Sequence, residues 1–374
     1  MADDSNVRVE RRDLLKGIGT AGVAGVAGCL GGDSGDEPYY PHTIWGMYGA
    51  WEEAYVQGGE FYAEDHGYDF ENQNTQGNDD EQISHIQNFR QQQADGILVG
   101  PVSATAPVGQ VEAAVDDDIP VIAANSDIET DALTMSVYIG NEPACEELGA
   151  EIVDYLNTEV ESDGTVLNLQ GDLGMSIGVE REQGFKNAVE GQDGINVHDV
   201  SANFSREEAQ ENTYSLLQSE DGEIDAIFAA NSEMAIGAAN ALDTYGMDPG
   251  NVFIASMDGS PALIDHMDEG WVQRGFSQPT QYYLPIAMYY LEQVRTEGED
   301  ALPEVGDEVT TDDLEITGEE HMGTDIWTEQ DWAPAEVQER HGHRWFQTNG
   351  RLLTPDNYND SANWGVIFAD EAGD

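Results

Sequence analysis

Short apolar runs alternate with amphipathic stretches along most of this chain. The clearest example is residues 224–246, where the apolar run IDAIFAA is followed by Asn231 and Ser232 and then by apolar positions at helical spacing. A short apolar run predicts a buried strand, and apolar positions every three or four residues predict an amphipathic helix. The stretch is therefore predicted to be a strand, a turn and a helix, with Ser232 as the helix cap.

The same alternation extends from residue 42 to residue 295 and occurs as two sets in tandem, the second beginning near Glu142. Strands separated by helices are typical of a parallel sheet with helices on both faces, so the pattern predicts two similar α/β lobes. The first set has predicted strands at 43–48, 68–74, 96–101, 119–124 and 135–139 and helices at 51–66, 79–93 and 106–118. Besides the unit at 224–246, the second has strands at 165–170, 195–200 and 252–256 and helices at 142–156, 179–189, 206–218, 261–269 and 282–295.

The place of Asn231 in this pattern makes it the first candidate for a binding site. In open α/β sheets, ligands bind at the carboxyl ends of the strands, where helix N-termini also present free polar groups. Residues 297–340 are acidic and carry little pattern, so the structure of the tail is left unassigned.

Charge narrows the range of functions. The 374 residues include 13 Lys and Arg against 75 Asp and Glu, which gives a formal net charge of −62. Such a surface repels nucleic acid phosphates and anionic lipid head groups, so nucleic acid binding is not expected. The acidic residues are scattered over the whole chain, which indicates adaptation to high salt, where charges are screened over ~3 Å at 1 M. An acidic site for a cationic ligand is the alternative interpretation.

The N-terminus has three features of an exported lipoprotein, in order. Residues 11–16 read RRDLLK, a Gly/Ala-rich run follows at 17–28, and VAGC ends at Cys29. This layout resembles a twin-arginine signal with a lipobox, in the form used by halophilic archaeal lipoproteins. The run is too short and too rich in glycine for a transmembrane helix. We therefore predict a signal at 1–28, lipidation of Cys29 and a tether at 29–41, which place the protein on the outer face of the cytoplasmic membrane. A chance arginine pair is the alternative.

With Cys29 lipidated, Cys145 is predicted to be a free thiol that serves as a small core residue.

Several motifs together resemble the type I (ribose/galactose/LacI-type) solute-binding proteins over roughly residues 43–295. The resemblance implies two Rossmann-like lobes with parallel sheets, joined by three crossings, with the solute in the cleft between them. The crossings are expected near 139–141, near Gln278 and after Arg295. The implied lobes are 42–140 plus 279–300, and 141–278 plus part of 301–374. The motifs are DGILVGPV (95–102), IPVIAAN (119–125), EREQGF (180–185), IDAIFAANSEMAIGA (224–238), SMDGSP (256–261) and GFSQP (275–279).

Four polar contacts of that family have counterparts here. The resemblance implies that Arg181, Asn231, Asp258 and Gln278 bind the solute. These side chains suit a neutral, polyhydroxylated ligand, because arginine donates, aspartate accepts, and the amides do both. For Arg181, a salt bridge between helix and loop is the alternative role.

Aromatic side chains are expected to stack on the apolar face of a sugar ring. By resemblance, Trp51 and Phe204 occupy the stacking positions of the two lobes, although either could belong to the core. Tyr48, Glu52 and Ser103 are further candidates at neighbouring strand ends.

The chain departs from the family's usual pattern at two places. Asn125 and Ser126 stand where hexose and pentose binders have an Asp-Arg pair, and Gly49 replaces an asparagine. The N-terminal lobe thus lacks the strongest hydroxyl clamp. The departures favour a sugar other than ribose or glucose, a polyol or another small polar solute, and Asn125 and Ser126 stay among the candidates.

Two local motifs hint at other chemistry. GMSIG at 174–178 matches the nucleophile elbow of serine hydrolases, but an elbow needs its serine on the turn that joins strand to helix. Ser176 is predicted to lie in a loop and to line the cleft beside Arg181. HGH at 341–343 could suggest a metal, although two histidines without a third ligand at a known spacing are a weak signal.

The sequence therefore predicts a lipid-anchored receptor that captures a sugar or polyol and delivers it to the permease of an ABC importer, without a cofactor. The alternatives are an extracytoplasmic sensor subunit of the same fold, a repressor core and, using Ser176, a serine hydrolase. The export signal, the charge and the absence of an N-terminal helix-turn-helix oppose the repressor.

Overall fold

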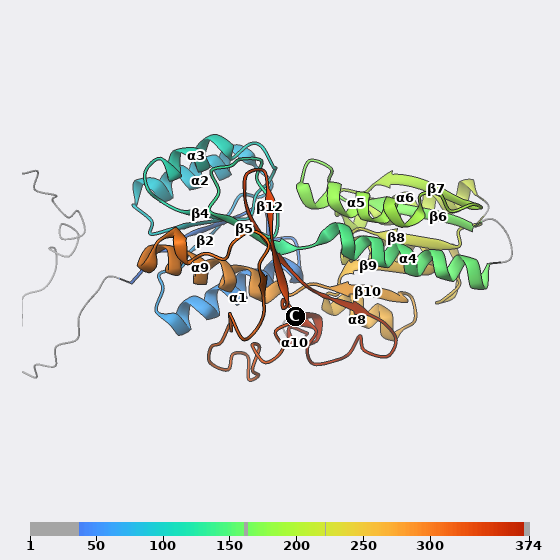
Figure 1. Ribbon diagram of the computed structural model, residues 1–374. Helices are drawn as coiled ribbons and strands as arrows, with labels where there is room; N and C mark the ends of the chain where they lie inside the picture. Colours follow the sequence, from blue (N-terminus) through green and yellow to red (C-terminus); the bar gives the residue numbers. More distant parts are fainter. Residues whose placement is uncertain (1–36, 161–163, 221, 370–374) are drawn as a thin grey trace, which may run out of the picture. The chain divides into compact units, whose positions relative to one another are not determined.

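The computed structural model describes residues 37–160, 164–220 and 222–369. Strands in this part of the chain form two separate sheets, one with eight strands and one with six (Figure 1). Helices accompany both sheets, so the predicted α/β class with two lobes is confirmed. The predicted Cys29 lipidation and the predicted signal lie outside the described residues. No helix within these described ranges has the length and apolarity that crossing a membrane requires.

The N-terminal lobe is built on the eight-stranded sheet, in the order β11-β12-β13-β5-β4-β3-β1-β2. Figure 1 shows α2 and α3 on one side of this sheet and α1 and α9 on the other. Because both faces are covered, β3 and β4 are apolar and buried at every position. The first elements are β1 (His42–Ile44), α1 (Ala50–His66), β2 (Asn72–Asn74), α2 (Asp79–Gln91), β3 (Ile97–Val99), α3 (Val108–Val115), β4 (Val121–Ala124) and β5 (Met135–Ile139).

The C-terminal lobe is built on the six-stranded sheet, in the order β14-β10-β9-β8-β6-β7. Helix α4 packs with α5, and α6 packs with α7. The elements are α4 (Asn141–Glu159), β6 (Gly164–Gln170), α5 (Ser176–Val189), β7 (Ile195–Ser201), α6 (Arg206–Ser219), β8 (Ala226–Ala229), α7 (Ser232–Tyr245), β9 (Phe253–Asp258), α8 (Pro261–Asp268) and β10 (Arg274–Ser277). The chain then returns through η2 (Thr280–Tyr282) and α9 (Tyr283–Glu297).

The tail, which the sequence left unassigned, adds strands to both sheets. Strand β13 runs parallel to β5, whereas β12 and β11 follow antiparallel at that edge. Strand β14 pairs antiparallel with β10 in the other sheet. The sheets are therefore parallel in their centres and mixed at these edges. The tail elements are η3 (Glu299–Ala301), β11 (Glu308–Val309), β12 (Ala335–Arg340), β13 (His343–Thr348), β14 (Arg351–Leu353) and α10 (Trp364–Ile367).

The described chain passes between the two sheets at three places. These are the step from β5 to α4, the step from β10 to α9, and the step from β13 to β14. All three lie at carboxyl ends of strands, so polar residues from distant segments meet there.

Two local predictions are wrong. Ser176 is the first residue of α5 instead of a loop residue, because the helix begins three residues earlier than predicted. The cap of α7 is Asn231 and not Ser232, since the Asn231 side chain accepts the hydrogen bond of the Met234 amide. The prediction for Cys145 is confirmed: it is a free cysteine, and it is fully buried.

Candidate functional site

Asn231 lies where β8 gives way to α7, as the sequence predicts. Its Oδ1 accepts from the Met234 amide at 2.9 Å, and its Nδ2 donates to the Phe204 carbonyl oxygen at 3.3 Å. Both ends of the amide therefore bind protein, and Asn231 orders the loop that carries Phe204. Next to it, the Ser232 hydroxyl donates to the Met257 carbonyl oxygen.

Arg181 is almost completely buried, with 3% of its surface exposed. Its Nη1 lies 3.3 Å from Asp258 Oδ1 and donates to the Ala230 carbonyl oxygen at 2.6 Å. Its Nε donates to Asn141 Oδ1 at 2.8 Å. The guanidinium thus joins the ends of β8 and β9 to the first residue of α4. A buried charge needs such partners, since an unpaired one is costly.

Asp258 is the centre of a second set of contacts. Its Oδ2 accepts from the Ser232 amide at 3.3 Å, and its Oδ1 accepts from Gln278 Nε2. The Tyr283 hydroxyl then donates to Gln278 Oε1 at 3.0 Å. Burial raises the pKa of Asp258, whereas the charge of Arg181 opposes that shift. The predicted residues Arg181, Asp258 and Gln278 therefore form one hydrogen-bonded cluster.

The backbone of Asp258 has an unusual conformation that the tail supports. Its φ of 92° lies in the left-handed region, which a residue with a side chain rarely adopts. The indole Nε1 of Trp364, in α10, donates to the Asp258 carbonyl oxygen at 2.6 Å. Trp364 is 1% exposed. We infer that its buried ring helps to hold the Asp258 turn in place.

The two predicted stacking residues occupy different surroundings. Trp51 is half-buried and lies in an aromatic group, with ring centroids 5.3 Å from Tyr55, 5.6 Å from Trp45 and 6.3 Å from Tyr283. Phe204 is also half-buried, and the Arg181 guanidinium lies 5.7 Å from the centre of its ring. Phe204 therefore belongs to the polar cluster. Trp51 joins that cluster through Tyr283 while also packing against the core.

Glu52 follows Trp51 in α1. Burial raises the pKa of its carboxyl group to about 7, and the negative charge of Asp258 acts in the same direction, against hydrogen bonds from backbone amides. The carboxyl groups of Glu52 and Asp258 therefore influence each other from opposite lobes. Near neutral pH, Glu52 can donate as well as accept a hydrogen bond.

The raised pKa of Glu52 predicts a pH-dependent contribution to stability. Between about pH 4.5 and 7 the native state binds a proton that the unfolded state has released, so this contribution falls as the pH rises. Glu52→Gln is expected to gain on the order of 2 kcal/mol of unfolding free energy relative to the wild type across that range. Urea unfolding at a series of pH values measures the difference. Parallel curves for the two proteins would contradict a raised pKa at Glu52.

Ser126 and Ser176 contact each other, and Asn125 directly precedes Ser126 in the chain. The hydroxyl oxygens of Ser126 and Ser176 lie 2.9 Å apart, and the Asp127 amide donates to the Ser176 hydroxyl at 3.0 Å. Ser176 comes from α5 of the C-terminal lobe, so it contacts the N-terminal lobe directly. Asn125 is buried with a φ of 73°, and its backbone amide donates to the Val137 carbonyl oxygen.

Two weaker candidates lie outside these contacts. The Ser103 hydroxyl donates to Asp79 Oδ1 at 2.9 Å and accepts from the Ala106 amide, as expected for a residue that orders a turn. Tyr48 is 65% exposed. Neither has a hydrogen bond to Arg181, Asp258 or Gln278 among the interactions of the described residues.

Besides Trp364, sequence reasoning missed four further residues that contact the cluster or its partners. Asn141 binds Arg181, and Tyr283 binds Gln278, as given above. Glu180 accepts from Asn141 Nδ2 at 3.3 Å, and Arg340 lies 2.6 Å from Glu180 Oε1. Glu180 lies directly before Arg181 in the EREQGF motif, which was an available signal. Arg340 belongs to the tail, where no pattern indicated a role.

The histidines of the HGH motif bind protein. His343 is buried, with Nδ1 2.8 Å from the Thr130 carbonyl oxygen and Nε2 3.0 Å from Asp127 Oδ1. His341 Nε2 lies 3.7 Å from Asp127 Oδ2. No group of three or more His, Cys, Asp or Glu residues suited to a metal ion occurs within the described ranges.

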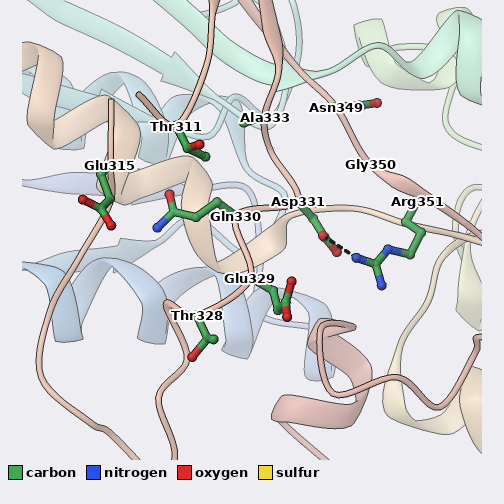
Figure 2. A pocket seen from close by; sticks show the side chains of 10 residues that line it. All are labelled: Thr311, Glu315, Thr328, Glu329, Gln330, Asp331, Ala333, Asn349, Gly350 and Arg351. Carbon is green, nitrogen blue, oxygen red and sulfur yellow. Dashed lines mark hydrogen bonds and ion pairs between the residues drawn. The ribbon is translucent and has the colours of Figure 1, made fainter. Parts of the chain in front are cut away.

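A pocket of about 450 Å³ lies in the tail. It is lined by residues between 311 and 333 and by Asn349, Gly350 and Arg351. Figure 2 shows the side chains of Asp331 and Arg351 directed toward each other, and their ion pair measures 2.7 Å. None of the predicted site residues lines this pocket.

Comparison with known proteins places the chain in a family. Residues 43–300 match the model of the periplasmic binding protein domain, which is most of the chain. The chain belongs to the periplasmic binding protein family. The resemblance inferred from the motifs is thus confirmed for this stretch. The relatives of this periplasmic binding protein support its assignment to the type I group, whose members bind solutes for sugar ABC transporters.

Two relatives and one solved structure show the extent of the similarity. The galactofuranose-binding protein YtfQ of Escherichia coli is 29% identical over 231 residues, which cover 60% of this chain and 72% of the relative. The ribose import binding protein RbsB of Escherichia coli is 28% identical over 196 residues, covering 52% and 64%. The crystal structure of a galactofuranose binding protein aligns with a TM-score of 0.72 and 21% identity, covering 90% of this chain and 100% of that one.

These relatives are solute-binding proteins and not enzymes, which agrees with the prediction of no enzymatic activity. The Ser176 hydroxyl is engaged by Ser126 and by the Asp127 backbone amide.

Proposed function

We propose that this periplasmic binding protein captures a small neutral sugar or polyol between its lobes and delivers it to an ABC importer. The observation that carries the proposal is the buried Arg181–Asp258 pair, extended by Gln278, at the carboxyl ends of the strands. Both relatives described above are named for binding a monosaccharide. The departure at Asn125 and Ser126 favours a ligand other than ribose.

The charges of the cluster support a neutral ligand. Arg181 and Asp258 largely balance each other, so a charged solute would upset a pair that is already buried. Arginine donors, the carboxylate and the Gln278 amide together offer donors and acceptors in the mixture that hydroxyl groups require. The described hydrogen bonds of Arg181 use Nε and Nη1, and we expect Nη2 to serve the ligand.

Aromatic side chains supply the second half of the proposed site. Phe204 comes from the C-terminal lobe, next to Arg181, and Trp51 comes from α1 of the N-terminal lobe. A sugar ring has apolar C–H faces that pack on such rings. A ligand held by both aromatic side chains would bridge the two lobes.

The proposed mechanism is closure about the three crossings. The lobes are joined at these steps, and the Ser126–Ser176 contact connects them from side chain to side chain. A ligand that contacts both lobes binds the closed arrangement more tightly than the open one, and it therefore shifts the population toward closure. The closed form would then present both lobes to the permease.

Export by the twin-arginine route and anchoring through Cys29 are part of the proposal. They rest on the RRDLLK and VAGC motifs alone. An anchored receptor would be kept close to the permease that it serves.

A thermal-shift screen of the protein in high salt tests the proposed function. A ligand that binds only the native state, present at a hundredfold excess over its Kd, raises stability by about 2.7 kcal/mol. We expect one sugar or polyol in a panel that also holds nucleosides and amino acids to raise the Tm.

Asp258→Asn is the control, because it keeps the shape of the side chain but removes the acceptor charge. The shift should shrink in this variant. A shift with only a nucleoside or an amino acid would overturn the proposed ligand class.

A further inference from the structure

Arg340, the last residue of β12, connects the two lobes. Its Nε lies 3.0 Å from Asp127 Oδ2, and its Nη2 lies 2.6 Å from Glu180 Oε1. Asp127 follows β4 in the N-terminal lobe, whereas Glu180 belongs to α5 in the C-terminal lobe. Both carboxyl groups are buried. One guanidinium from the tail therefore forms ion pairs with a buried carboxyl group of each lobe.

Aromatic rings hold the Arg340 guanidinium in this position. It lies 5.2 Å from the centre of the Trp345 ring and 6.0 Å from that of Tyr138. The two rings stack with centroids 4.8 Å apart, and Trp345 Nε1 donates to the Tyr138 carbonyl oxygen at 3.2 Å. Because β13 is paired with β5, Trp345 and Tyr138 are fixed by the sheet itself. The guanidinium thus has rigid surroundings, which a flexible surface arginine lacks.

A continuous path of contacts leads from Arg340 to the proposed ligand site. Glu180 Oε2 accepts from Asn141 Nδ2 at 3.3 Å, and Asn141 Oδ1 accepts from Arg181 Nε at 2.8 Å. Asn141 is fully buried. A carboxylate can only accept, so an ionised Glu180 turns the Nδ2 end of the Asn141 amide toward itself and leaves Oδ1 for Arg181. The Ile139 carbonyl oxygen, which also accepts from Nδ2, acts in the same direction.

We propose that Arg340 is a positioning residue for the ligand site, and that it fixes the guanidinium of Arg181 through Glu180 and Asn141. The role of Arg181 toward a ligand rests on the function proposed above, whereas the path from Arg340 to Arg181 does not. Periplasmic binding protein motifs in residues 43–300 contain Arg181 and Glu180, but the tail supplies the cation that organises them.

Removal of Arg340 should act on Glu180 first. Burial raises the pKa of Glu180 to about 7. Among the groups that lower this pKa, the positive charge of Arg340 has the largest effect, followed by hydrogen bonds from Asn141 and the Tyr138 hydroxyl. The charge of Asp127 raises it. Near pH 7 Glu180 is thus about half protonated in the wild type, and without the guanidinium its pKa should rise further, so that the protonated form predominates at neutral pH. A protonated carboxyl group can donate, so it no longer sets the direction of the Asn141 amide.

The direct test is the Nε–H resonance of Arg181 in a nitrogen–proton correlation spectrum of the ligand-free protein. Arg181→Lys identifies the signal, because that variant lacks it. In Arg340→Gln we expect the signal to shift or broaden and the Kd for the sugar or polyol found in the screen to rise about tenfold. In Arg340→Lys, which keeps a positive charge beside Glu180, the signal should stay near its wild-type position.

Two further variants separate positioning from general damage. Arg344→Gln is the matched control, because Arg344 lies in the adjacent strand β13 and its side chain donates to the Pro303 carbonyl oxygen at 3.0 Å. It should leave both the signal and the Kd unchanged. In a double-mutant cycle, Arg340→Gln should have little further effect on Kd once Glu180→Gln is present, since Arg340 acts through Glu180.

An unchanged Arg181 signal in Arg340→Gln would overturn the inference, whatever happens to the affinity. Additive effects of Arg340→Gln and Glu180→Gln would overturn the path through Glu180. If the wild type binds no sugar or polyol, the proposed function fails, while the resonance still decides whether Arg340 positions Arg181. If Arg340→Gln does not fold, the Arg181 signal is compared between Arg340→Lys and Glu180→Gln instead. Equal signals in these two variants would contradict the path through Glu180.

Discussion

Arg181→Ala should weaken binding of the sugar or polyol at least tenfold and destabilise the protein. Hydrogen bonds to a charged group contribute about 1.5–3 kcal/mol, and the lower figure already exceeds a factor of ten in Kd. The substitution also leaves the buried carboxylate of Asp258 without its cation, which costs about 3–5 kcal/mol in comparable pairs. Titration calorimetry measures the first effect, and urea unfolding in high salt measures the second.

Arg206→Ala is the matched control for that variant. Arg206 pairs with Glu233 at 2.8 Å, but its side chain is 41% exposed, and pairs of this kind contribute only about 0–1 kcal/mol. Stability should therefore change little. Asp258→Ala should lose binding to an extent similar to Arg181→Ala. Unchanged affinity in both Arg181→Ala and Asp258→Ala would rule out the proposed site.

Trp364→Ala should lower the free energy of unfolding by about 3–5 kcal/mol, the usual cost of truncating a buried tryptophan. The ring is 1% exposed, and α10 packs against α8. The variant also removes the donor to the Asp258 carbonyl oxygen, so we expect weaker ligand binding as well. Urea unfolding and calorimetry of the same samples report the two effects.

Trp364→Phe separates packing from the hydrogen bond. Phenylalanine keeps most of the buried apolar surface but has no N–H group, so stability should largely recover while the affinity stays reduced. If Trp364→Phe binds as tightly as the wild type, the indole N–H does not support the site. A Trp364→Ala variant as stable as the wild type would contradict the packing argument.

The alternation of strands and helices was predictable because the spacing of apolar residues within each element reflects which of its positions are buried. Strand β8 is buried at every position of AIFA, and α7 carries a buried face at helical spacing. Boundaries were less certain, since the first turn of α5 contains Ser176 and Gly178, residue types that also favour turns. The cap of α7 went to Asn231 for a local reason, namely that its side chain and not that of Ser232 reaches the Met234 amide.

Part of the candidate site was also predictable from local sequence. Asn231 and Asp258 follow or end apolar strands, and parallel strands place their carboxyl ends at one edge. Arg181 and Gln278 lie in motifs that resemble those of a known family. The structure brings Arg181, Asp258 and Gln278 into contact, but their role in ligand binding stays a prediction.

By itself, then, the sequence determined the α/β class, the two tandem sets and the polar residues at the strand ends, because periodicity and strand ends are local properties. Only the tertiary structure decided what Arg340, Trp364 and Asn141 contact. Trp364 reaches Asp258 across 106 positions, and His343 reaches Asp127 across 216. Such contacts depend on where β12, β13 and α10 dock on the two sheets. No local pattern of hydrophobic and polar residues predicts how these elements pack on the sheets, so the residues that support the site could be identified only in the tertiary structure.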